Sequence, residues 1–89
     1  MLKVTADFDG RLEGLRMEGT LPFPPYRGLV LGVLDEDGTW NESETCLEVV
    51  RAVWCHDHFH VTVVSEDDEE YTKEGIRQLF SKIGWKFSQ

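Results

Sequence analysis

The chain has 89 residues, 40% of them hydrophobic and 29% charged, a composition typical of one small globular domain over residues 1–89. Its formal net charge of −8 excludes a generic nucleic-acid binder that neutralises many phosphates, because the field of the protein would repel DNA or RNA. Two cysteines, the lack of a leader pattern and the lack of a long apolar run predict a cytoplasmic protein with no membrane partner.

The first third of the chain predicts a β-hairpin followed by a stiff connector. Residues 2–8 alternate apolar and polar side chains, the period of a half-buried strand, and Asp9-Gly10 supplies a turn. Residues 11–17 continue as a second strand whose alternation slips at Gly14, as a bulge or bend would require. Three prolines in residues 21–26 exclude a helix or a central strand there.

The middle of the predicted fold is formed by two segments, residues 28–34 and 41–55. The first is a short continuous apolar run, which indicates a strand buried on both faces. The second is ambiguous, because its valines and Trp54 favour a strand whereas its polar positions favour a helix. Glu44, Glu48, Arg51 and Cys55 recur at spacings of four, three and four, which is one helix face. Asn41 followed by Glu44 also resembles a capping box, and we therefore expect a helix.

The last third predicts a strand, a helix and a short terminal strand. In residues 58–64, Phe59, Val61 and Val63 face one way. The acids of residues 66–70 would begin the helix, where the helix dipole favours negative charge. An amphipathic stripe follows at i, i+3, i+4 and i+7, formed by Ile76, Leu79, Phe80 and Ile83.

These elements predict an α+β fold, a small two-layer domain in the order β-β-β-α-β-α with a terminal strand at Trp85 and Phe87. The third strand, first helix and fourth strand would form a right-handed crossover in a mixed sheet of four to five strands. Two helices can cover only one face, so the other face is left open for a ligand or for homodimer formation. If residues 41–55 are a strand instead, the fold becomes a β-meander with one helix and the histidines move to a hairpin tip.

All three histidines of the chain lie in the run Cys55-His56-Asp57-His58-Phe59-His60. On a strand that reaches back to His56, a period of two places His56, His58 and His60 on the uncovered face. Imidazoles at i and i+2 can share a tetrahedral metal, with a carboxylate or Cys55 completing the shell. The sequence therefore supports a zinc-binding protein or metal-dependent hydrolase as the alternative function.

The negative charge is concentrated in residues 28–72, which contain twelve acids and one base, Arg51. Such a segment suits a basic protein partner, and no nucleophile or phosphate-binding glycine loop indicates an enzyme. We therefore expect a small acidic binding domain, of the inhibitor, immunity or accessory type, with no catalytic residues. The partner-binding residues expected are Asp35, Asp37, Glu42, Glu66, Asp67, Asp68 and Glu69.

Overall fold

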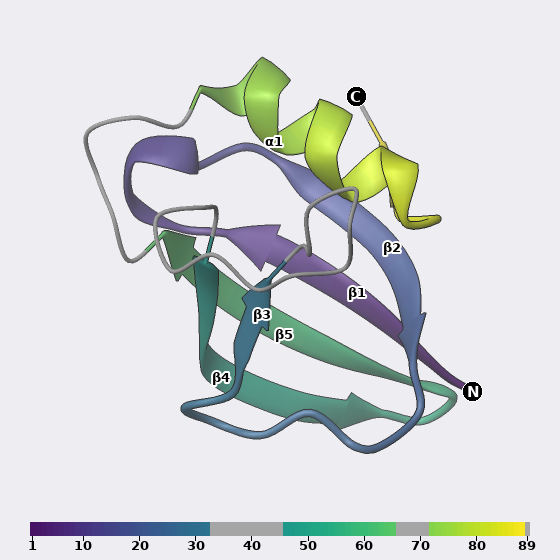
Figure 1. Ribbon diagram of the computed structural model, residues 1–89. Helices are drawn as coiled ribbons and strands as arrows, with labels where there is room; N and C mark the ends of the chain where they lie inside the picture. The colour runs from purple at the N-terminus through teal and green to yellow at the C-terminus, as the bar shows by residue number, and fades with distance from the viewer. Residues whose placement is uncertain (33–45, 66–71, 89) are drawn as a thin grey trace.

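The structure, a computed structural model, describes residues 1–32, 46–65 and 72–88 (Figure 1). Its strands are β1 (Leu2–Phe8), β2 (Arg16–Leu21), β3 (Val30–Gly32), β4 (Cys46–Cys55), β5 (His58–Ser65) and β6 (Lys86–Phe87). A helical turn, η1 (Gly10–Leu12), joins β1 to β2, and one α-helix, α1 (Lys73–Lys82), precedes β6.

The six strands form one curled sheet, a half-barrel, in the order β3-β4-β5-β1-β2-β6. β1 pairs in parallel with β5 at the centre, and the other neighbouring strands are antiparallel. The predicted α+β domain with two helices and four to five strands is therefore wrong, because the described residues contain six strands and a single α-helix. The predicted crossover from the third strand through a helix to the fourth is also wrong, since β3, β4 and β5 follow one another as antiparallel neighbours.

The error over residues 41–55 has a physical cause, a β-bulge between Val49 and Arg51. On a regular strand, Glu48 and Arg51 would point to opposite faces. Because the bulge inserts one residue, Glu48 pairs with Val64 and Arg51 pairs with Thr62, two positions of β5 that share a face. The spacing of three that imitates a helix is thus produced by a bulged strand. Asn41 and Glu44 lie outside the described residues.

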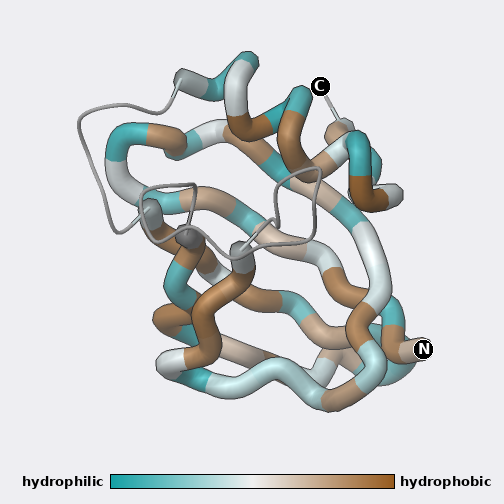
Figure 2. Tube along the Cα trace, viewed as in Figure 1, coloured by the Kyte–Doolittle hydropathy of each residue, from teal (hydrophilic) through white to brown (hydrophobic). Residues whose placement is uncertain are grey.

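The core lies on the concave side of the sheet, beneath α1. Alternate residues of the central strands point into it, and Figure 2 shows apolar and polar residues alternating along the chain. The predicted inward positions of residues 2–8 and 58–64 are confirmed. The fully buried strand residues, at most 1% exposed, are Val4, Ala6, Met17, Leu47, Val49, Val61 and Val63.

Two of the predicted strands differ in detail from the structure. Residues 10–12 form the helical turn η1 instead of continuing a strand, and Gly14 has a φ of +99° that glycine adopts without strain. This path places Leu12 and Leu15 in the core. The strand predicted over residues 28–34 is present as β3, but its Val30 is 41% exposed, so it is not buried on both faces.

Helix α1 packs over the sheet (Figure 1), with Ile76 and Phe80 of the predicted apolar stripe buried and Leu79 packed against the core. Ile83, the last residue of the predicted stripe, caps the helix and is 51% exposed. The N-cap of the helix is Thr72, whose hydroxyl accepts a hydrogen bond of 3.0 Å from the backbone N–H of Gly75. The acids at residues 66–70 therefore precede the helix, outside the described residues, and do not form its first turn. The predicted terminal strand is confirmed as β6. Within the described ranges, the structure contains no helix with the length and hydropathy needed to span a membrane.

Candidate functional site

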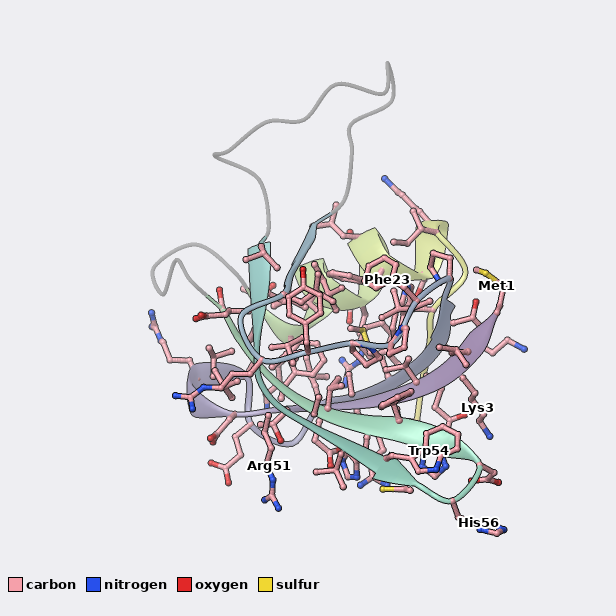
Figure 3. All side chains as sticks on the ribbon, turned by 90° about the horizontal axis from the view of Figure 1, so that it is seen from below. Met1, Lys3, Phe23, Arg51, Trp54 and His56 are labelled. Atoms are coloured by element: carbon pink, nitrogen blue, oxygen red, sulfur yellow. The ribbon has the colours of Figure 1, made fainter. Side chains whose placement is uncertain are left out.

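The face of the sheet opposite α1 is lined mostly with polar side chains from four neighbouring strands. The registers place these residues side by side: Lys3, Thr5 and Asp7 on β1, Arg16 and Glu18 on β2, His58, His60 and Thr62 on β5, and Arg51, Val53 and Cys55 on β4. Figure 3 shows the side chain of Arg51 projecting from the side of the sheet away from α1. No element of the described residues covers this face, and self-association through it would desolvate several charged groups.

Asp7 is the centre of a hydrogen-bond network on this face. Its Oδ1 accepts a bond of 2.6 Å from Arg16 Nε, and its Oδ2 accepts a bond of 3.1 Å from the same guanidinium. Nε2 of His60 lies 2.5 Å from Oδ2. These contacts link three neighbouring strands, β2, β1 and β5. The sequence did not indicate this cluster, because the parallel pairing that brings Asp7 to His60 joins residues 53 positions apart.

The Arg16 hydrogen bonds hold the pKa of the Asp7 carboxyl below its usual 3.8; partial burial opposes this effect, and the His60 hydrogen bond adds to it. A lowered folded-state pKa means that the ionised carboxylate stabilises the fold. This contribution is complete above pH 3.8 and is lost as the pH falls through the lower folded-state value. Both partners are about a third to a half exposed, so solvent screening keeps the contribution small.

Replacing Asp7 by asparagine is therefore expected to lower the stability at pH 7 by about 1 kcal/mol, equivalent to about 4–8 °C in melting temperature for a domain of this size. The difference from the parent protein should shrink as the pH falls through the lowered folded-state pKa of Asp7, because the parent carboxyl then becomes protonated as well. Thermal denaturation of both proteins at a series of pH values from 7 to 2 measures this difference in stability. Glu13→Gln, a change at an exposed acid, is the control and should show no comparable gap. A gap for Asp7→Asn that is independent of pH would contradict the ion-pair explanation.

The three histidines do not form the single row that was predicted. His56 lies in the turn between β4 and β5 with a φ of +64°, whereas His58 and His60 remain on the uncovered face. Nδ1 of His58 lies 2.6 Å from Oδ1 of Asp57, a contact that lowers the pKa of that carboxyl. Across residues 1–32, 46–65 and 72–88, no three His, Cys, Asp or Glu side chains are grouped to hold a metal ion. The zinc site therefore stays a prediction of the sequence.

A small hollow opens on the uncovered face between β4 and β5. It has a volume of about 200 Å³ and is lined by Arg51, Val53, Cys55, His60 and Thr62. Cys55 carries a free thiol and is partly buried. A larger hollow of about 440 Å³ lies at the far end of β1, where Asp7, Glu13 and Arg16 bring both signs of charge together.

All seven residues that were predicted to bind a partner lie outside the described residues: Asp35, Asp37, Glu42, Glu66, Asp67, Asp68 and Glu69. Their positions in the chain still relate them to the sheet. Residues 33–45 connect Gly32 of β3 to Cys46 of β4, and residues 66–71 follow Ser65 of β5. Gly32 pairs with Cys46, and Leu47 pairs with Ser65, so both segments join the same end of three neighbouring strands.

No protein-family model, curated protein or solved structure matches this chain.

Proposed function

We propose that the protein is a small cytoplasmic binding domain that engages a basic protein partner through two acidic segments, residues 33–45 and 66–71. The observation that carries this proposal is the separation of charge along the chain. The two segments contain ten of the 17 acids and none of the nine Lys and Arg residues. The rest of the chain has nine bases and seven acids, a net charge of +2.

The sheet brings the ends of the two segments together. They join β3, β4 and β5, and the outer two of these strands are about 10 Å apart, two strand spacings. This separation is close to the Debye length of about 8 Å at physiological ionic strength. The fields of the two segments therefore reinforce each other where they join the sheet, and a basic surface would be attracted to this end of the molecule.

Binding of this kind depends on salt, because mobile ions screen attraction between exposed charges. The free thiol of Cys55 fits a reducing compartment, which supports the cytoplasmic assignment. Complementary charge at an interface mainly increases the rate of association. A basic partner would therefore associate faster with this protein than a neutral one.

A pair of variants with equal charge tests the proposal. Asp67→Asn with Asp68→Asn removes two charges from an acidic segment, and Glu13→Gln with Glu18→Gln removes two from the neutral N-terminal part. The probe is a synthetic lysine-rich peptide, and its Kd is measured at about 50 and 300 mM salt. We expect the segment variant to weaken binding about fivefold at low salt, at about 0.5 kcal/mol for each exposed charge. The control variant should weaken binding less than twofold.

Two outcomes would count against the proposal. Equal weakening by the two variants would mean that the probe senses only the net charge of −8 and not the acidic segments. A Kd that does not change with salt would mean that charge attraction is not the mechanism.

A further inference from the structure

We propose that the hollow between β4 and β5 is a binding site for an oxyanion of the phosphate class. Among the described residues that line it, two offer hydrogen-bond donors to an anion: Arg51 through its guanidinium and Thr62 through its hydroxyl. None of the described residues that line it carries a carboxylate. This site is separate from the acidic segments and goes beyond the function proposed for them.

The β-bulge creates the site. Without the extra residue after Val49, Arg51 would share the inward face of that fully buried valine. The bulge turns Arg51 to the open face and sets it directly across from Thr62, while Val53 lies across from His60. Bulges are common next to functional sites, where they redirect a side chain.

Arg51 is available for a ligand. No ion pair joins it to another residue of the described ranges, and its side chain extends away from the sheet in Figure 3. Glu48 shares this face of β4 but pairs with Val64, beyond Thr62, and does not line the hollow. An arginine without a carboxylate partner can give two parallel hydrogen bonds to a phosphate group.

His60 is held in place by its neighbour Asp7. Its Nε2 is bonded to Asp7, which orients the ring. The Asp7 carboxylate is itself paired with Arg16 through two nitrogens, so its negative charge is largely compensated and repels an anion in the hollow less strongly. The volume of about 200 Å³ is below the 300–1,000 Å³ or so of drug-sized sites, and it suits a single anionic group.

The test is a titration of ¹⁵N-labelled protein with inorganic phosphate, compared with sodium chloride at equal ionic strength. We expect saturable NMR shifts at the Arg51 side-chain Nε–H, the Thr62 amide and the His60 ring. Arg51→Gln should weaken binding at least about tenfold, because a hydrogen bond to a charged group is lost. The matched control is Arg27→Gln, an exposed arginine on the connector before β3, which should leave the affinity unchanged.

Two further measurements sharpen the result. Thr62→Val keeps the side-chain shape and removes one hydroxyl donor, so binding should weaken about threefold to tenfold. O-phosphoserine distinguishes a free anion from a phosphate monoester, because tighter binding than inorganic phosphate would identify the monoester as the natural group. Shifts that do not saturate, or equal affinities for the parent protein and Arg51→Gln, would overturn the proposal. A melting curve for each variant shows that the fold is retained.

Discussion

Replacing Gly19 by alanine is expected to destabilise the domain by about 3 kcal/mol, equivalent to a fall of 12 °C or more in melting temperature. Gly19 lies on β2 beneath the indole of Trp85, which is only 7% exposed. A Cβ at residue 19 would lie 2.3 Å from Cδ2 of Trp85, and two more ring atoms would lie within 2.7 Å. Since this overlap involves a rigid ring and not a flexible chain end, the indole must move out of the core.

Urea denaturation of a double-mutant cycle measures this effect. In a Trp85→Leu background, Gly19→Ala should cost much less than in the parent protein, because the smaller side chain leaves room for the methyl group. Gly75→Ala is the comparison within α1, where alanine favours the helix and the new Cβ would lie 3.3 Å from the Thr72 hydroxyl, so its cost should be far smaller than that of Gly19→Ala. Equal costs of Gly19→Ala in both backgrounds would show that contact with Trp85 is not the cause.

Replacing Phe80 by alanine is expected to cost about 3–5 kcal/mol, a large part of the 5–15 kcal/mol or so that stabilises a typical domain. Phe80 is 1% exposed and meets the ring of Trp85 edge to face, with ring centroids 6.3 Å apart. Its loss removes the largest fully buried side chain of the described residues and leaves a cavity between α1 and the sheet.

Chemical denaturation again gives the free energy of unfolding for this variant. Ile83→Ala at the end of the same helix is the control, because Ile83 is 51% exposed and its truncation should change the stability by about 0.5 kcal/mol or less. Similar costs for both variants would contradict the placement of the core beneath α1.

Periodicity predicted the elements whose two faces differ in burial. Residues 2–8 and the inward positions Phe59, Val61 and Val63 show the alternation of half-buried strands, and Ile76, Leu79 and Phe80 show the stripe of a helix. These patterns reflect local contact with a core, so they can be seen in a short window of sequence. Each of these elements is present in the structure.

Register irregularities and long-range pairing could not be predicted from the same patterns. The bulge after Val49 gives Glu48 and Arg51 a shared face, which in a single sequence cannot be distinguished from a helix. The parallel contact of β1 with β5 joins Asp7 to His60, and no local signal reports it. The candidate anion site depends on both features, so the histidines could be noticed in the sequence but their partners Asp7, Arg51 and Thr62 could not.

The most direct test of the proposed function is an NMR titration of ¹⁵N-labelled protein with the lysine-rich peptide at low salt. We expect the largest amide shifts in residues 33–45 and 66–71 and at the strand ends Gly32 and Ser65, and we expect them to disappear at high salt. The opposite end of the sheet, at Leu2 and the turn at His56, should shift little. Shifts concentrated at that opposite end, or spread evenly over the acids of the whole chain, would contradict binding through the two acidic segments.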